Sequence, residues 1–432
     1  MQVYLDHAAT TKPYDEVIEI MGEVALSQYA NPSSLHSLGL EAEKLLKKSR
    51  KTIADAIHAK PEQIIFTSGG TESDSTAIYS AFPRSKDARG RRFMHSDIEH
   101  PAVRVCGTQL LEEGADVLRI PVDSDGLVDL GFISTHVGNT DKLDLISVMH
   151  VNNEVSTVEP IGEIGKILSA YTNDRNTQPI FHVDAVQSFM KHKIDVTLPE
   201  WSRVDMISMS GHKIGGPRGI GALYVRDLSK IKPFMIGGGQ ERGYRSGTEN
   251  LPAIVGFSKA VEIRARNLQS NYEHVTEIKK YFYEKLLQNL GYIVEPQNHT
   301  VSIPQSISLS TSQSASEAIE VRLNGPSLGE PYASPYLIDL SFIGVPGEIL
   351  LHELESRNVY ISTGSACSSN TKSKNNQVLK AIGVDLKGQD SAVRFSFAPD
   401  TTIGEIDYAV AQITEAVETL SVVLKFAGVN KR

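Results

Sequence analysis

A single lysine lies among hydroxyl and glycine residues in the stretch 208–217, Ser-Met-Ser-Gly-His-Lys-Ile-Gly-Gly-Pro. The apolar run before it, residues 204–209, predicts a buried strand. Directly after such a strand Lys213 is poorly suited to packing, whereas a desolvated and positioned amine can form an imine with an aldehyde. An ordinary loop lysine is the alternative, so the interpretation depends on the rest of the chain.

A second chemical feature follows a short strand predicted over residues 63–67. The next residues, 68–73, read Ser-Gly-Gly-Thr-Glu-Ser and then begin a helix. Exposed N–H groups at a helix N-terminus form a site for an anion such as phosphate, and Gly70 and Thr71 are the candidate donors. A capped helix start is the alternative, since Thr71 or Ser73 could be an ordinary N-cap.

Further polar residues lie at or just past the ends of predicted strands. The run 145–151 is nearly continuous in apolar residues, as in strands buried on both faces of a parallel sheet. The run 180–187 repeats this arrangement with an aspartate. Ligands of open α/β sheets bind at the carboxyl ends of the strands. We therefore expect one sheet edge to carry His100, Asn153, Asp184, Gln187, Ser210, His212 and Lys213.

These residues have structural alternatives as turn or cap residues, but together they favour a cofactor. A buried aspartate is costly unless it is paired, and Asp184 could otherwise be a helix N-cap. Pyridoxal phosphate (PLP) would offer a partner, because its enzymes hold it as a lysine Schiff base and place an acid at the pyridinium nitrogen. Lys213 and Asp184 match these two requirements.

Three later features add candidates. The glycine-rich stretch 237–250 predicts an ordered loop that brings Thr248, and Arg242 as a further candidate, to an anion. Arg394 in the strand predicted over 392–397 is a candidate clamp for a carboxylate, or a surface ion pair. Cys367 lies in a Gly/Ser-rich loop and is not a packing residue, whereas Cys106 fits a structural role.

Composition limits the class of protein. The chain has 432 residues, 40% hydrophobic and 22% charged, typical of a globular protein with two or three domains. A net charge of -9 argues against direct nucleic-acid binding and an anionic membrane surface, and no apolar run reaches the length of a membrane span. Two distant cysteines exclude a disulfide framework or a zinc site. We expect a cytoplasmic protein, since strand-like sequence begins at once and leaves no room for a signal peptide.

Strands alternate with helices over the first part of the chain, which predicts a doubly wound α/β domain. We place the domain boundary near residue 258, inside a helical region from about 251 to 290. The remainder predicts a second domain, in which residues 313–335 are rich in Ser, Gly and Pro and are interpreted as a surface excursion.

Motifs in this order resemble those of the cysteine desulfurases, PLP-dependent enzymes of the fold type I or class V aminotransferase group. The resemblance runs from Tyr4 to about Leu420. Its motifs are Leu-Asp-His-Ala-Ala-Thr-Thr at 5–11, Asn-Pro-Ser-Ser at 31–34 with His36, the stretch 67–73, Glu-His at 99–100, His-Val-Asn-Asn-Glu at 150–154, 182–187, Ser-Gly-His-Lys at 210–213, Arg-Ser-Gly-Thr at 245–248 and Gly-Ser-Ala-Cys at 364–367. The long loop after Gly-Ser-Ala-Cys is similar to the loop of those cysteine desulfurases that serve iron–sulfur assembly and tRNA thiolation.

The resemblance implies a fold and a division of the chain. We expect a large domain with a mostly parallel seven-stranded sheet over 15–257, and a smaller α+β domain over 258–432 that carries the cysteine loop. An N-terminal segment, 1–14, should pack with the small domain. It also implies a homodimer.

The resemblance further implies residue roles. Lys213 would form the Schiff base and move protons, Asp184 would pair with the pyridinium, and His100 would stack on the ring and assist proton transfer. Cys367 would take the sulfur of L-cysteine as a persulfide, leaving L-alanine, and would pass it to a protein acceptor such as an iron–sulfur scaffold or a tRNA-thiolation enzyme. The other ring, phosphate and substrate contacts would be Gln187, Asn153, Gly70, Thr71, Ser210, His212, Arg394 and, across a dimer interface, Thr248.

Two departures from the family pattern stand out. Residues 313–335 have the character of an insertion, and 370–377 lack the usual Pro-Ser, which leaves the acceptor open. The alternatives are a selenocysteine lyase or aminotransferase of the same fold, or a non-catalytic sulfur-carrier or scaffold subunit. A metal hydrolase is remote, because the histidines lack a helical metal-binding spacing.

Overall fold

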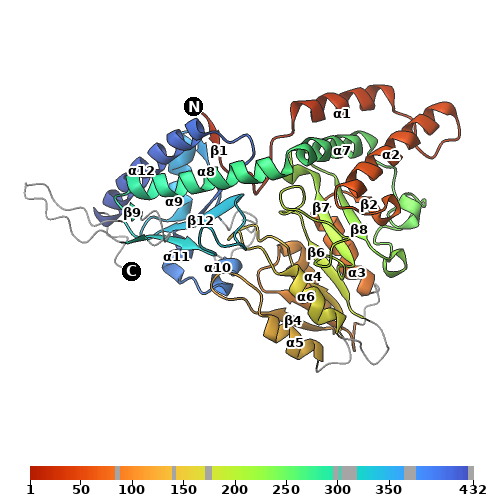
Figure 1. Ribbon diagram of the computed structural model, residues 1–432, viewed down its shortest axis with the longest axis horizontal. Helices are drawn as coiled ribbons and strands as arrows, with labels where there is room; N and C mark the ends of the chain where they lie inside the picture. The colour runs from red at the N-terminus through yellow and green to blue at the C-terminus, as the bar shows by residue number, and fades with distance from the viewer. Residues whose placement is uncertain are drawn as a thin grey trace, which may run out of the picture.

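A computed structural model describes residues 1–82, 88–138, 143–170, 178–294, 301–302, 319–363 and 376–426. Two groups of elements form its body, one around a seven-stranded sheet and one around a three-stranded sheet (Figure 1). Among the helices of these residues, none is long and apolar enough to cross a membrane. Cys367, the residue predicted to carry the persulfide, lies outside the described ranges.

The large sheet is mostly parallel, as predicted. Its strand order is β2-β8-β7-β6-β5-β3-β4, and only β8 runs antiparallel to its neighbours. The strands are β2 (Ile64–Thr67), β3 (Arg92–Ser96), β4 (Asp116–Ile120), β5 (Leu143–Ser147), β6 (Ile180–Asp184), β7 (Met206–Ser210) and β8 (Gly221–Val225). The predicted α/β fold with a seven-stranded sheet is confirmed.

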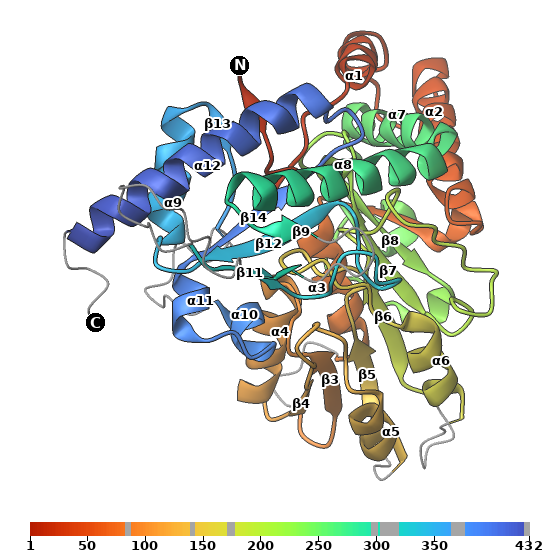
Figure 2. The same cartoon turned by 60° about the vertical axis from the view of Figure 1, so that its left-hand side comes forward.

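Helices cover both faces of this sheet. Leu145 packs with the cluster that holds α3 and α4, whereas Ile146 packs with the cluster of α5 and α6, because successive side chains of a strand point to opposite faces. Helices α5 and α6 lie together beside the strands (Figure 2). The helices of this part are α1 (Asp15–Ser27), α2 (Ser37–Asp55), α3 (Gly70–Ala81), α4 (Pro101–Glu112), α5 (Leu130–Gly138), α6 (Ile161–Ser169) and α7 (Leu251–Arg266).

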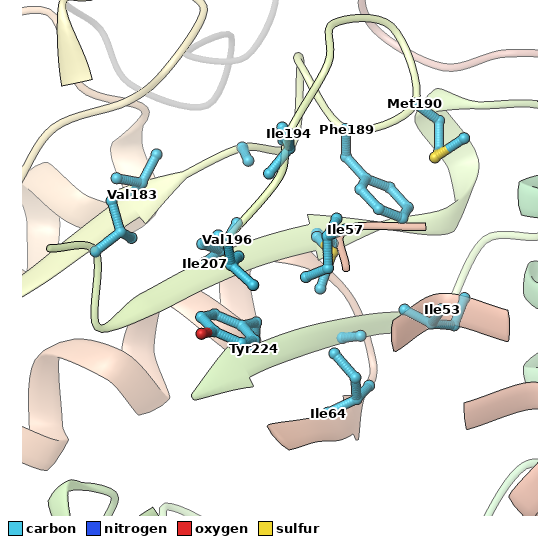
Figure 3. Packing of buried hydrophobic residues seen from close by; sticks show 14 of the residues in the cluster. Ile53, Ile57, Ile64, Val183, Phe189, Met190, Ile194, Val196, Ile207 and Tyr224 are labelled. Atoms are coloured by element: carbon cyan, nitrogen blue, oxygen red, sulfur yellow. The ribbon is translucent and has the colours of Figure 1, made fainter. Parts of the chain in front are cut away.

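The largest apolar cluster lies on the sheet face opposite α3. Ile207 of β7 and Tyr224 of β8 pack there with Ile57, which follows α2, and with Phe189 from the connection after β6 (Figure 3). On β6 the same alternation turns Val183 into this core and leaves His182 and Asp184 on the α3 face. The core therefore determines which face receives the polar side chains.

The second group is built on an antiparallel sheet with the order β11-β12-β14. Its core joins the strands to α8, α9 and α12. The elements are α8 (Leu268–Asn289), β11 (Val321–Asn324), β12 (Leu337–Phe342), α9 (Gly347–Ser356), α10 (Gln377–Ala381), α11 (Leu386–Asp390), β14 (Ala392–Ser396) and α12 (Ile403–Phe426). Two small sheets pair β1 (Val3–Tyr4) with β13 (Val359–Tyr360) and β9 (Ile293–Val294) with β10 (Val301–Ser302).

The interpretation of 313–335 as a surface excursion is wrong for its described part. Residues 321–324 form β11, an edge strand of the three-stranded sheet, and Ser334 is buried. Backbone groups bond this segment to the large-sheet group, since Val158 N–H donates to Tyr332 and Ser334 N–H donates to Ser156. Its Gly, Pro and Ser content therefore reflects turns within packed structure.

The predicted boundary at residue 258 falls inside α7. Helix α7 packs on α1 and α2, whereas α8 packs on α12. The helical region 251–290 is divided at Asn267, where the backbone leaves the helical conformation with φ −129° and ψ 22°. The exact domain limits stay a prediction.

Candidate active site

A cavity of about 270 Å³ opens where the carboxyl ends of β6 and β7 meet the N-termini of α3 and α4 and β14 of the small sheet. It collects ten of the twelve predicted site residues: Gly70, Thr71, His100, Asn153, Asp184, Gln187, Ser210, His212, Lys213 and Arg394. Thr248 is exposed and does not line this cavity, and Cys367 lies outside the described residues. Ala8 and Ala9 complete one wall.

Lys213 ends a single 3-10 turn, η2 (Gly211–Lys213), directly after β7. Its Nζ donates hydrogen bonds to the carbonyl oxygens of Ala8, at 2.6 Å, and Ala9, at 2.8 Å. The N-terminal segment thus holds the amine in the cavity. These carbonyl groups left no signal in the sequence, because backbone acceptors do not depend on residue type.

Asp184 is the acid at the end of β6. Burial raises the pKa of its carboxyl to about 6, against the lowering effects of the Val186 N–H and the Lys213 charge. The Val186 N–H donates to Asp184 Oδ1 at 2.9 Å. A carboxyl in this setting gains a partner when a cationic N–H donor occupies the cavity.

Asp74 of α3 is a second buried acid on the cavity wall, and our sequence analysis missed it. Its Oδ1 lies 3.5 Å from His182 Nε2 and has no hydrogen-bond partner among the described residues. Burial, and then the Asp184 charge, raise the pKa of Asp74 well above its ordinary value. A polar residue in the second turn of a helix is common, so its position gave no signal.

The start of α3 lies against the loop after β6. A Cβ atom added to Gly70 would come within 2.6 Å of Val186 Cγ2, so this approach requires glycine. Thr71, Ser210 and His212 line the same cavity. Burial, and then the charges of Lys213 and Lys191, lower the pKa of His212 to about 3, so its ring is a neutral hydrogen-bonding group.

His100 caps α4, since its Nδ1 accepts the Ala102 N–H at 3.2 Å. Burial, and then the charges of Lys213 and Arg104, lower the pKa of His100 to about 4. The imidazole is therefore neutral near pH 7. With Nδ1 accepting, the ring hydrogen is on Nε2.

Gln187 connects the same wall to a buried lysine. Its Nε2 donates to the Ala8 carbonyl at 2.8 Å, which also accepts from Lys213. Lys191 Nζ donates to Gln187 Oε1 at 3.0 Å. Both ends of the amide are thus fixed, and its orientation follows from the two partners.

Arg394 is buried at 3% exposure, so the alternative of a surface ion pair is wrong. It donates to the Asn153 carbonyl at 2.7 Å and to Asp6 Oδ1 at 2.9 Å. Arg242, the further candidate for an anion, does not line this cavity, and its guanidinium donates to the carbonyls of Glu62 and Ile64.

Comparisons with known proteins show the family to which the chain belongs. The Aminotransferase class-V family model matches residues 3–325. A cysteine desulfurase IscS of Dictyoglomus turgidum is 36% identical over 100% of this chain and 99% of its own length. A mitochondrial cysteine desulfurase of Eremothecium gossypii is 36% identical over 97% of this chain and 76% of its own length.

Solved structures give the same result. A NifS-like protein aligns with a TM-score of 0.80 and 31% identity, over 97% of this chain and all of that one. A structure described as SspA in complex with cysteine aligns with a TM-score of 0.71 and 32% identity, over 93% of this chain and 100% of that one. The resemblance seen in the motifs is confirmed: the chain belongs to the aminotransferase class-V family and, within it, to the PLP-dependent cysteine desulfurases.

Proposed function

We propose that this chain removes the sulfur of L-cysteine with the help of PLP, giving L-alanine and a persulfide on Cys367. The observation that carries the proposal is the single cavity that joins Lys213, Asp184 and Arg394. An amine, a buried acid and a guanidinium in one place suit an amino-acid substrate on an aldehyde cofactor. The full-length similarity to cysteine desulfurases supports the same reaction.

The donor set fits PLP. The buried carboxyl of Asp184 suits a pyridinium N–H, and the N-terminus of α3 at Gly70 and Thr71 suits a phosphate, with Ser210 and His212 beside it. Gln187 and Asn153 are the proposed contacts to the ring oxygen and the substrate. When bound, PLP supplies an electron sink for the α-carbon of the substrate.

The remaining roles belong to the chain's own groups. Lys213 Nζ is the proposed anchor for the cofactor aldehyde and moves a proton at the substrate α-carbon. Neutral His100 is proposed to stack on the ring and to exchange a proton. Arg394 binds the substrate carboxylate. Exposed Thr248 is proposed to serve the phosphate site of a second copy in a homodimer.

The residues that flank Cys367 support its assignment. Ser362 exchanges two backbone hydrogen bonds with Arg394, at 3.2 and 2.7 Å. Ser362, five residues before Cys367 in the sequence, is thus joined to the strand that carries Arg394. On the other side, Gln377 contacts Arg104 of α4, the helix that His100 caps.

Cys106 is unsuited to the role. It lies half-buried beside an apolar cluster, with its Sγ 3.8 Å from Ser75 Oγ. Burial raises the pKa of this thiol, which lowers the fraction of reactive thiolate. Cys367 is therefore the cysteine that we propose to carry the persulfide. From there sulfur would pass to a protein of iron–sulfur assembly or tRNA thiolation, and the cytoplasmic location stays a prediction.

The experiment that tests this proposal measures sulfide and alanine released from L-cysteine with PLP and a thiol reductant. We expect Cys367→Ser to lose at least about 100-fold in rate, because a serine hydroxyl cannot carry persulfide sulfur. Cys106→Ser is the matched control and should keep the wild-type rate within about twofold.

Three results would contradict the proposal. Full activity of Cys367→Ser would exclude a persulfide on that residue, and a strong preference for selenocysteine with equal rates in both variants would indicate a lyase. A chain that binds no PLP, judged by its absorption spectrum, would point to a non-catalytic subunit.

A further inference from the structure

Arg394, the proposed clamp for the substrate carboxylate, has an acidic partner from the other end of the chain. Its NH2 group donates to Asp6 Oδ1 at 2.9 Å, and the two side chains are 4% and 20% exposed. We propose that Asp6 is a positioning residue that orients Arg394 for the substrate carboxylate. This inference rests on the proposed function. It adds to the proposed carboxylate site a residue that does not line the cavity.

The backbone around Asp6 is held against Ser396 at the end of β14. Ser396 N–H donates to the Leu5 carbonyl at 2.7 Å, and the Ala8 N–H donates to Ser396 Oγ at 2.8 Å. Asp6 and Ser396 form a parallel β-bridge between these two bonds. Asp6 therefore lies beside the strand that carries Arg394, in a register set on both sides of it.

The guanidinium has two fixed partners and unused donors. NH1 donates to the Asn153 carbonyl at 2.7 Å, NH2 donates to Asp6, and the buried Nε has no partner among the described residues. Because the group is planar, two partners on different elements fix its plane. The remaining N–H groups can then meet a carboxylate in a defined direction. Without Asp6, only the Asn153 carbonyl would fix the plane.

Asp6 also neutralises the charge of Arg394, and this second effect opposes the binding of another carboxylate. The two effects have opposite signs. If Asp6 positions the guanidinium, its removal weakens binding of a carboxylate, because misplacement by about 1 Å is costly. If Asp6 competes, its removal strengthens binding.

The experiment uses the PLP-loaded protein and two ligands that differ only in a carboxylate. L-alanine, the proposed product, and ethylamine are titrated while the absorption of the bound cofactor is recorded, and KM and kcat are measured for L-cysteine. For Asp6→Asn we expect about a tenfold rise in the Kd of L-alanine and in KM, with ethylamine affinity within about twofold. Asp6→Glu, which keeps the charge, should recover part of the L-alanine affinity.

Asp205→Asn is the matched control, because Asp205 forms a buried pair with Arg203 at 2.6 Å away from the cavity. It should lower stability without changing the ratio of the two ligand affinities. An unchanged or lower Kd of L-alanine in Asp6→Asn would overturn the inference. Arg394→Lys separates the two failures: if this variant also leaves the ratio unchanged, the carboxylate role of Arg394 in the proposed function is wrong.

Discussion

Glu99 adjoins His100 and is buried beneath the site. Its Oε1 accepts the Ser96 hydroxyl at 2.6 Å and the Met149 N–H at 2.8 Å, while Oε2 has no partner among the described residues. Burial raises the pKa of Glu99 from 4.5 to about 8, against the lowering effect of Ser96. The folded chain therefore takes up a proton on this group near neutral pH.

The first prediction concerns this proton. Because the pKa is higher in the folded state, the contribution of Glu99 to stability is fully present below about pH 4.5 and is lost as the pH rises to about 8. Glu99→Gln resembles the protonated form at every pH. The unfolding free energy of this variant, relative to that of the wild type, should therefore rise as the pH increases across this range, by up to about 4 kcal/mol.

Urea unfolding of the cofactor-free variants between pH 5 and 8.5 measures this difference. A difference that stays constant with pH would show that Glu99 is ionised in the folded chain. Exposed Glu348 in the first turn of α9 provides the control, since Glu348→Gln should show no comparable pH dependence.

At the level of residues, the sequence revealed side chains at the ends of strands. Asp184, Gln187 and Lys213 could be predicted because polar groups directly after apolar runs have few structural uses. Asp74 could not, since its helical position is ordinary. Asp6 belongs to a motif, but its contact with Arg394 depends on β14, 388 residues away.

Among the elements, β8 is packed unusually closely. A Cβ atom on Gly221 would lie 2.5 Å from the Met209 carbonyl oxygen and 2.7 Å from Gly69 Cα. Both neighbours are backbone atoms, which cannot turn aside as a side chain can. The close packing joins β8 to β7 and to the turn that leads into α3.

The prediction for this element is that Gly221→Ala separates β8 from the turn at Gly69. We expect a loss of about 1–3 kcal/mol in unfolding free energy, together with weaker PLP binding, because Gly69 precedes the proposed phosphate donors. Chemical unfolding and cofactor titration measure the two effects. The control is Gly22→Ala in α1, where an added Cβ meets nothing within 4 Å and should be neutral or stabilising. Equal stability of the two variants would contradict the close packing.

Element prediction succeeded where burial dominates the pattern. The apolar runs of β5, β6 and β7 indicated strands, whereas β4 was missed because Asp116 and Arg119 are exposed and interrupt its pattern. The antiparallel direction of β8 and the entry of β11 into a sheet depend on distant partners. Neither the strand direction of β8 nor the pairing of β11 can therefore be predicted from the local sequence.

In the whole molecule, the N-terminal segment joins the two groups of elements. Strand β1 pairs with β13, and Thr11 contacts the residues around Lys213. The Thr11 hydroxyl donates to the His212 carbonyl at 2.8 Å and accepts the Gly215 N–H at 2.7 Å. These bonds hold the turn that carries the proposed cofactor lysine.

The corresponding prediction is that Thr11→Val, which keeps the shape, leaves the Gly215 N–H without its acceptor. The unfolding free energy should fall by about 1–3 kcal/mol, and PLP affinity should fall with it. Thr414→Val in α12 removes only a hydroxyl bonded to the carbonyl of its own helix and is the control. If both variants lose the same small amount, Thr11 does not support the site.

The pairing of β1 with β13 also affects the chain during its synthesis. The paired residues, 3–4 and 359–360, are separated by most of the sequence, and ribosomes add about 5–20 residues per second. The first strand therefore waits roughly 20–70 s for its partner, and Asp6 waits longer still for Arg394. A nascent chain that already contains Lys213 still lacks the proposed substrate clamp, so a complete site forms only after β14 has been synthesised.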